Sequence, residues 1–498
     1  MIHPIQNKYN RRWLRHGVAA ALMLSIAACN GQRDKSAVQV DVIGEPDQMA
    51  RPLQNSMSAA GKLILGATAQ GLLSFDANGE VVGAMAESWI VEDGGQSFIF
   101  RLKRLNWPGG EPVKAEQVAR LLRERMRANP LSLAGLEPDV RAMTDRVIEI
   151  RLDVSLPAFL QLLAQPQLAI LPRGGGTGPY EGVDDKGAAD LIPVVPPLAP
   201  SLEVDEEEQV TPQIDHRHLR AMRASLALVR FKAGESDLVL GGRFQHLPLT
   251  KVVGLTQNEV EFDPAPGLFG LGFTSKSKFL DDLAVRDALA RVVDRAQIGA
   301  ALSLPTWATR VYPMPGPLEL ERQPSAPAWT GEPIAERIVS ARGIIERWVA
   351  ANGEPPMLRI ALPEGPGASL LFRRLARDFG QIGVSVDRVA MDEAADLRLI
   401  DEIAPFDSAF WYLSRLDCAG GLRCDSRVAP LLEQARKQQD RDEQARLLGE
   451  AEEATVAYAG FIPLGQPIRW AAVGRRLTGF QPSPRGVHPL NRLIITPR

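Results

Sequence analysis

Strand patterns and helical patterns follow each other along most of this chain, and that order restricts the fold class. Residues 38–43 (VQVDVI) alternate in a way that is typical of a β-strand. Residues 114–126 (KAEQVARLLRERM) instead place apolar side chains at helical spacing. Because strands and helices alternate throughout, the sequence predicts an α/β or α+β fold.

The same patterns predict the other elements. Further strands are expected at residues 87–91, 97–102 and 147–152. Helical segments are expected at residues 64–75, 156–163, 218–233, 283–302, 334–351, 368–382 and 428–457. Residues 193–214 are rich in proline and acidic side chains, which predicts a surface loop. Its run Asp205 to Glu208 is interpreted as a solvated acidic segment, with a cation site as the alternative.

The first 28 residues have the layout of a secretory signal peptide. Four basic residues and no acidic residue precede an apolar run at 17–28 (GVAAALMLSIAA), which ends in small side chains. The run is shorter than the roughly 20 apolar residues that cross a bilayer. The sequence therefore predicts export and removal of this leader.

The residues around Cys29 resemble the lipobox of bacterial lipoproteins. Residues 26–29 (IAAC) put small side chains before a thiol, and the resemblance implies cleavage before Cys29 and its acylation (palmitate or a similar chain). Residues 29–37 then form a lipidated polar tether that holds the protein to the periplasmic face of a membrane. The choice between inner and outer membrane stays open. The alternative is a buried N-terminal helix with an incidental cysteine.

Charge and cysteine content narrow the class of protein further. The chain has 498 residues, and removal of the leader with its four cations takes the formal net charge from −3 to −7, which argues against nucleic acid as a partner. With Cys29 acylated, Cys418 and Cys424 remain, and an oxidising compartment predicts that they form a disulfide. Two free buried thiols are the alternative, and a metal site is disfavoured because structural zinc needs four ligands.

The sequence carries none of the common catalytic motifs. The sequence contains no HExxH, GxSxG or Walker motif. The glycines of residues 174–178 are followed by Pro179 and Tyr180 rather than by a phosphate-binding helix. His216 and His218 are interpreted as surface residues at a helix start. We therefore expect no catalytic residue, no cofactor and no metal.

Residues 71–126 resemble the signature region of family 5 extracellular solute-binding proteins. The segments AESW (86–89) and WPGGEPVKAEQV (107–118) match that family's pattern. Four further blocks follow in family order: GTGPY at 176–180, FKAGESD at 231–237, FTSK at 273–276 with VRDAL at 285–289 and DR at 294–295, and FDSAFW at 406–411 with IPL at 462–464. The resemblance covers about residues 38–490.

The resemblance implies a type II periplasmic-binding-protein fold with two lobes that close on a ligand. Lobe one is expected to contain residues 38–262 and 468–498, with a small subdomain at about 66–175. Lobe two is expected at residues 263–467. The two hinge crossings would lie near 262–272 and 464–472.

The resemblance also implies a function: a monomeric receptor that binds a peptide or similar small solute and delivers it to the permease subunits of an ABC importer. Peptide-binding members hold the peptide ammonium with an aspartate ahead of a cysteine pair. The matching stretch here lacks the family's DPDN core, so Asp417 is the candidate. Arg415, Trp411, Tyr412 and Gln70 are further candidate ligand contacts. The alternatives are a ligand sensor or periplasmic chaperone on the same fold, and an extracytoplasmic hydrolase is disfavoured.

Overall fold

The computed structural model describes residues 37–76, 78–133, 135–185, 188–194, 216–304, 307–320 and 322–495. The predicted leader, the predicted lipidation site Cys29, the acidic run 205–208 and most of the predicted loop at 193–214 lie outside these ranges. Residues from Val38 onward form one compact unit. No helix within the described part of the chain has the length and apolar character needed to cross a bilayer.

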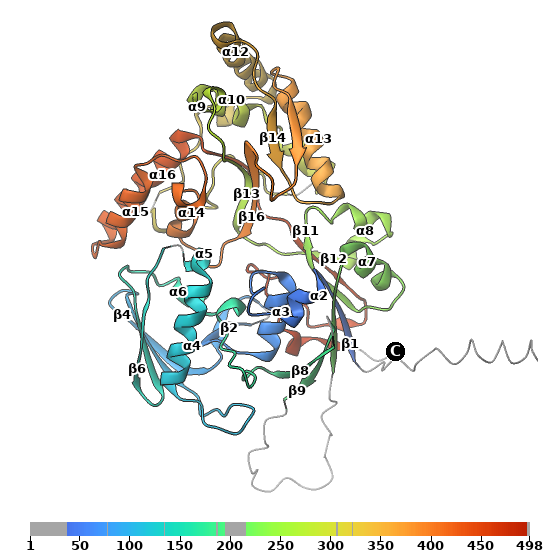
Figure 1. Cartoon of the computed structure of the whole chain (residues 1–498), viewed down its shortest axis with the longest axis vertical. Helices are drawn as coiled ribbons and strands as arrows, with labels where there is room; N and C mark the ends of the chain where they lie inside the picture. The colour runs from blue at the N-terminus through green and yellow to red at the C-terminus, as the bar shows by residue number, and fades with distance from the viewer. Residues whose placement is uncertain are drawn as a thin grey trace, which may run out of the picture. The chain divides into compact units, whose positions relative to one another are not determined.

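A seven-stranded sheet, here called the first sheet, is built mainly from residues before 263, with one strand from near the C-terminus (Figure 1). Its central strand β1 (Val38–Ile43) confirms the prediction for residues 38–43 and pairs in parallel with β10 (Arg217–Met222) and β11 (Leu238–Arg243). The remaining strands are β12 (Val260–Phe262) and β18 (Arg469–Val473) at one side, and β9 (Ala188–Pro193) and β8 (Tyr180–Asp185) at the other. Helix α3 (Ala59–Thr68) contacts β1, β8 and β11.

The helix predicted at residues 218–233 is wrong in its first part. Residues 217–222 form strand β10, and only Ala224–Lys232 form a helix, α7. Along β10 the side chains of Arg217, Leu219 and Ala221 are buried and their neighbours less so, which is the period of two of a strand. Arg217 is buried because its guanidinium donates to the carbonyls of Leu490 and Leu493 near the C-terminus.

Three other predicted helices are shorter than expected. The helical pattern at 64–75 ends with α3 at Thr68 and gives way to strand β2 (Leu73–Phe75). The pattern at 283–302 divides into α10 (Leu283–Val292) and α11 (Arg295–Ala301), because Asp294 caps the second helix by accepting from the Gln297 amide. The pattern at 428–457 divides likewise into α15 (Val428–Arg436) and α16 (Arg441–Tyr458), with Asp440 as the N-cap.

A five-stranded second sheet is built from later residues. Its order is β15 (Val386–Val389), β14 (Leu358–Ala361), β16 (Leu397–Ile403), β13 (Gly267–Phe273) and β17 (Phe461–Gly465). Helices α12 (Ile334–Asn352) and α13 (Pro366–Gly380) confirm the predicted helices in this region. The chain passes between the two sheets twice, through residues 263–266 and again through 466–468.

A separate four-stranded sheet contains the strands predicted at residues 87–91, 97–102 and 147–152. Its order is β4 (Ala86–Glu92), β5 (Ser97–Leu102), β7 (Val147–Arg151) and β6 (Asp139–Thr144), and helix α4 (Ala115–Ala128) packs on β6 and β7. The predicted short helix at 156–163 is α6 (Phe159–Leu163). Trp107 of the WPGG segment donates its indole N–H to Gln117 Oε1 at 2.8 Å, which fastens the turn to α4.

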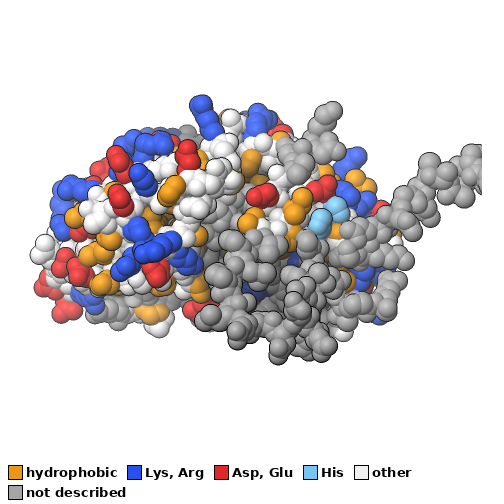
Figure 2. All heavy atoms as spheres, turned by 90° about the horizontal axis from the view of Figure 1, so that it is seen from below, with side chains coloured by type: hydrophobic (Ala, Val, Ile, Leu, Met, Phe, Trp, Pro, Cys, Tyr) orange, Lys and Arg blue, Asp and Glu red, His pale blue; other side chains and the backbone are white. Residues whose placement is uncertain are grey.

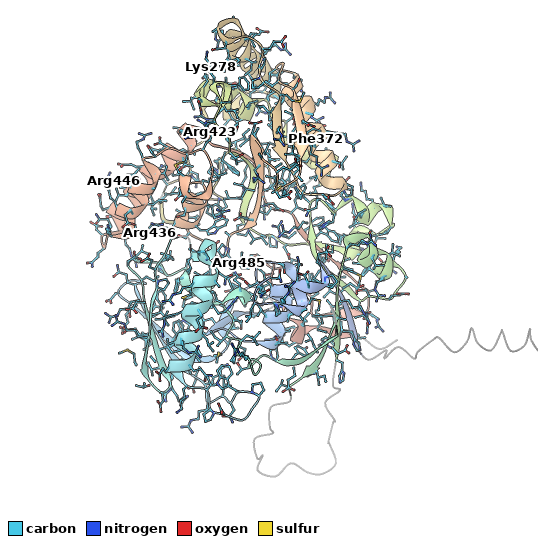
Figure 3. The ribbon with its side chains drawn as sticks, in the orientation of Figure 1. Lys278, Phe372, Arg423, Arg436, Arg446 and Arg485 are labelled. Atoms are coloured by element: carbon cyan, nitrogen blue, oxygen red, sulfur yellow. A yellow bond between two sulfur atoms is a disulfide. The ribbon has the colours of Figure 1, made fainter. Side chains whose placement is uncertain are left out.

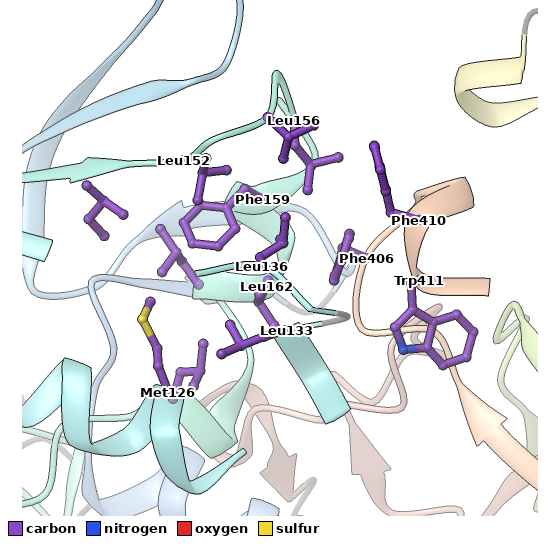
Figure 4. Packing of buried hydrophobic residues seen from close by; sticks show 14 of the residues in the cluster. Met126, Leu133, Leu136, Leu152, Leu156, Phe159, Leu162, Phe406, Phe410 and Trp411 are labelled. Carbon is purple, nitrogen blue, oxygen red and sulfur yellow. The ribbon is translucent and has the colours of Figure 1, made fainter. Parts of the chain in front are cut away.

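One apolar core joins this small sheet to the end of β16 and to the helices that follow that strand. The cluster runs through residues 72–170, includes Leu268, Met314 and Leu320, and continues through residues 400–454, which include α14 (Ala409–Arg415). The labelled side chains in Figure 4 come from both segments: Met126, Leu133, Leu136, Leu152, Leu156, Phe159 and Leu162 from the first, and Phe406, Phe410 and Trp411 from the second. The two parts of the chain are therefore held together by buried apolar surface.

Candidate functional site

A cavity of about 230 Å³ lies where α3, the ends of β11 and β18, and the C-terminal segment meet. Its wall includes Asp263 of the first passage between the sheets, Arg469 at the start of the strand after the second passage, and one residue of the second sheet, Ile403. The lining includes the polar residues Lys62, Gln70, Ser74, Gln165, Arg243, Asp263, Arg469, Arg485, His488 and Asn491 and the apolar residues Leu63, Leu73, Phe75, Leu240, Trp470 and Val487.

Lys62 is a part-buried cation of the cavity lining. It lies in α3 (AAGKLILGAT), whose other face is buried through Ala60, Gly61, Ile64 and Leu65. Burial is the main cause that lowers the Lys62 pKa to about 8, and the positive charges of Arg243 and Arg469 lower it further, against the opposing effect of Glu402. Protein atoms surround the side chain, while the cavity leaves part of it accessible.

Arg243 lies directly opposite a second arginine on the neighbouring strand of the first sheet. In the antiparallel pair of β11 and β18, Arg243 is the register partner of Arg469. Like charges directly opposite in a sheet repel. The charge of Arg469 and burial together hold the pKa of Arg243 below its usual range. Three cations, Lys62, Arg243 and Arg469, thus influence one another around this cavity.

Two of the four lining cations have carboxylate partners. Arg469 donates to Asp401 Oδ1 of β16 at 2.7 Å, and both side chains are about nine-tenths buried. Arg485 pairs with Asp407 and donates to the carbonyl of Ala404 at 3.0 Å; Figure 3 labels its place. Among the residues that the structure describes, the side chains of Lys62 and Arg243 have no hydrogen-bond or ion-pair partner.

The one lining carboxylate, Asp263, already has partners. Its Oδ1 accepts the Ser483 amide at 2.9 Å, and its Oδ2 lies 3.2 Å from His488 Nε2. These contacts tie the passage at 263–266 to the C-terminal segment. Asp263 therefore does not neutralise Lys62 or Arg243 by direct contact.

Of the residues predicted as ligand contacts, only Gln70 lines this cavity. It accepts from the Thr177 hydroxyl at 3.4 Å and forms a bridge with Ile170. Its place follows from α3, which ends two residues before it.

The other four predicted contacts lie outside the lining of this cavity. Trp411 and Tyr412 are buried in α14 and pack edge to face in the core. Arg415 pairs through Nε with Glu402 Oε2 at 2.8 Å, and Asp417 caps the turn after α14 by accepting from the Ala419 amide at 2.8 Å. The structure gives all four structural contacts, and their role as ligand contacts stays a prediction.

Two further predictions concern cysteine and histidine. Cys418 and Cys424 are joined by a disulfide, with their Cα atoms 5.2 Å apart, within the ordinary range for such a bond. His218 lies on β10, not at a helix start, and pairs with Asp190 of β9. In the described ranges no three His, Cys, Asp or Glu side chains are grouped closely enough to hold a metal.

Sequence reasoning missed Lys62 and Arg243. A signal for Lys62 was present, since it is the one charged residue in the otherwise apolar or small helix AAGKLILGAT. Arg243 ends the buried strand LVLGGR, but its position opposite Arg469 depends on a pairing between residues far apart in the sequence.

Comparison with known proteins identifies the family and supports the fold class. The family of bacterial extracellular solute-binding proteins, family 5, matches residues 80–412. A protein of Escherichia coli K12 named "Probable deoxycholate-binding periplasmic protein YgiS" is 24% identical over 330 residues, which are 56% of this chain and 57% of the relative. The nickel-binding periplasmic protein of the same organism is 33% identical over 101 residues, 19% of each chain. The chain thus spans little more than half the length of the first of these relatives.

Solved structures match over a larger share of the chain. Haemophilus influenzae OppA in complex with RPPGFSPFR has a TM-score of 0.74 at 17% identity, covering 93% of this chain and all of that one. AgaA in complex with agropinic acid, from A. tumefacien R10, has a TM-score of 0.67 at 16% identity, covering 93% and 99%. This likeness confirms the predicted class, a mixed α/β, type II periplasmic-binding-protein fold.

Proposed function

The chain belongs to family 5 of the bacterial extracellular solute-binding proteins, and on that premise we propose that it captures a peptide or similar small solute for an ABC importer. The solute occupies the cavity lined by Lys62, Gln70 and Arg243, and the loaded receptor delivers it to permease subunits in the membrane. The protein acts as a monomer and as a binding protein rather than an enzyme.

The observation that carries this proposal is that the cavity lies beside the two passages between the sheets. Asp263 lies on the first passage, and Arg469 begins the strand after the second. Residues 38–262 with 468–498 act as lobe one, with a subdomain at about 66–175, and residues 263–467 act as lobe two. A solute at that junction touches both lobes, so its binding favours the closed arrangement.

Polar contacts across the lobes support a closed arrangement. Gln161 of α6 accepts from the Asp407 amide at 2.8 Å, and Gln165 donates to the Pro405 carbonyl at 2.8 Å. Together with the Arg469–Asp401 and Arg485–Asp407 pairs, these bonds attach lobe one to residues 401–407 of lobe two. They add polar contacts to the apolar core that the same parts of the chain share, as expected of a closed receptor.

The N-terminal features complete the proposal. Cleavage before Cys29 and acylation of that residue anchor the receptor at the periplasmic face of a membrane, and residues 29–37 serve as its tether. The disulfide between Cys418 and Cys424 forms in that oxidising compartment. Relatives whose names or titles mention deoxycholate, nickel and agropinic acid show how varied the solutes of this fold are.

The test begins with the solute that co-purifies with the folded protein, identified by native mass spectrometry. The protein is then stripped of solute by unfolding and refolding, and the identified compound is titrated back by calorimetry. We expect one site per chain, weaker binding by the Gln70→Ala variant, and unchanged binding by the exposed control Gln439→Ala. Uptake of the labelled compound should fall when the gene is deleted. Binding without any loss of uptake would instead favour a sensor or chaperone.

A further inference from the structure

We propose that the solute is a small organic anion whose carboxylate is held between Lys62 and Arg243. The inference rests on the proposed function, because it specifies the chemistry of the solute in the same cavity. Neither the names of the relatives nor the sequence motifs assign these two residues a role.

The first argument is the absence of partners for two cations that are largely surrounded by protein. Charged groups are seldom withdrawn from water unless they are paired. Lys62 and Arg243 line one cavity, and neither meets a carboxylate within hydrogen-bonding distance among the described residues. The other two lining cations, Arg469 and Arg485, each have an aspartate. The two residues without partners are those that a ligand could satisfy.

The second argument is that the protein places these charges close to a third cation. Arg243 faces Arg469 across the sheet, and both charges act on Lys62. Glu402, whose negative charge acts on Lys62, already accepts two hydrogen bonds from Arg415. An anion between Lys62 and Arg243 would relieve this repulsion and would form charge-assisted hydrogen bonds with both. A cationic solute would increase the repulsion.

The third argument concerns the size and the walls of the cavity. Its volume of about 230 Å³ is below the range of roughly 300–1,000 Å³ that is usual for drug-sized ligands. Leu63, Leu73 and Trp470 add apolar wall beside the two cations. The arrangement fits a compact carboxylic acid with an apolar body. The one lining carboxylate, Asp263, already has partners and so leaves a free metal ion no unpaired carboxylate to bind.

The test uses the refolded, solute-free full-length protein and matched probes. Short aliphatic and aromatic carboxylates are each titrated beside the corresponding primary amide, with inorganic phosphate as a separate arm. Binding is followed by calorimetry and by tryptophan fluorescence. Lys62→Gln and Arg243→Gln are compared with Lys278→Gln and Arg127→Gln, which make the same charge changes at exposed positions (Lys278 is labelled in Figure 3).

We expect at least one carboxylate to bind while its amide does not. Each cavity variant should weaken that binding roughly tenfold to a hundredfold, the usual effect of losing one charge-assisted bond, and the exposed variants should leave it unchanged. Melting profiles by circular dichroism verify that the variants fold. Binding of a neutral or cationic solute that Lys62→Gln leaves intact would overturn the inference but not the proposed function. Binding of phosphate with no carboxylate would overturn the carboxylate assignment. Absence of binding by probes and by the co-purifying compound alike would overturn the proposed function itself.

Discussion

Replacing Lys62 by methionine should stabilise the solute-free protein, although it removes a charged residue from the binding site. Methionine has a side chain of similar length and shape without the ammonium. The cavity holds the Lys62 pKa at about 8 instead of 10.5, chiefly through burial. A lowered pKa means that the folded protein disfavours the charged form, so the wild type carries an energetic cost at neutral pH.

The size of this cost follows from the pKa. A decrease from 10.5 to about 8 corresponds to ~3 kcal/mol when each pKa unit is worth about 1.4 kcal/mol. Lys62 is partly exposed to solvent, which reduces the expected gain for Lys62→Met to about 1–2 kcal/mol at pH 7. Below pH 8 the gain is complete. It shrinks as pH rises toward about 10.4, where the lysine of the unfolded chain also loses its proton.

The assay is urea unfolding of solute-free protein at pH 7 and pH 10, followed by tryptophan fluorescence. The difference between wild type and Lys62→Met should be largest at pH 7 and should decrease at pH 10. The exposed control Lys278→Met should match the wild type at both values. If Lys62→Met is no more stable than the wild type at pH 7, or if its advantage is the same at pH 10, the account of Lys62 as an uncompensated buried cation is refuted.

Four further results are expected. Carboxylate affinity should fall as pH rises above about 8 in calorimetry, because Lys62 loses its proton; a flat profile would contradict this. Asp407→Asn should weaken solute binding about fivefold by loosening the side-chain contacts with Gln161 and Arg485 across the lobes, and unchanged affinity would argue against closure. Replacing both Cys418 and Cys424 by serine should cost about 2 kcal/mol in urea unfolding. Cys29→Ser should abolish palmitate labelling and release the protein from membranes; continued labelling would disprove the lipobox.

The fold could be predicted from the sequence where local patterns and packing agree. Strand β1 and helices α12 and α13 begin and end within two residues of their predicted positions, because each has one clear period. Prediction failed at residues 218–222. The strand there contains the polar residues Arg217 and His218, so its sequence does not resemble a buried strand. The Arg217 side chain is buried through its hydrogen bonds to carbonyls near the C-terminus.

The residues of the site were much harder to predict from the sequence. Gln70 was found through the family resemblance, whereas Lys62 and Arg243 gave no motif. Their importance comes from the pairing of β11 with β18, which are separated by more than 200 residues in the sequence. The charge of the whole chain also does not indicate the charge of the site. The net charge is negative, and acidic and basic side chains are interspersed on the face in Figure 2. The lining of the cavity is nevertheless rich in cations.

The most direct measurement is a crystal structure of the protein with the solute identified by mass spectrometry. The account predicts density for the solute in the cavity beside Gln70 and Trp470. One carboxylate should lie within about 3 Å of Lys62 Nζ and of the Arg243 guanidinium, the distance of a charge-assisted hydrogen bond. A solute bound elsewhere, or one that presents a neutral or cationic group to Lys62 and Arg243, would contradict it.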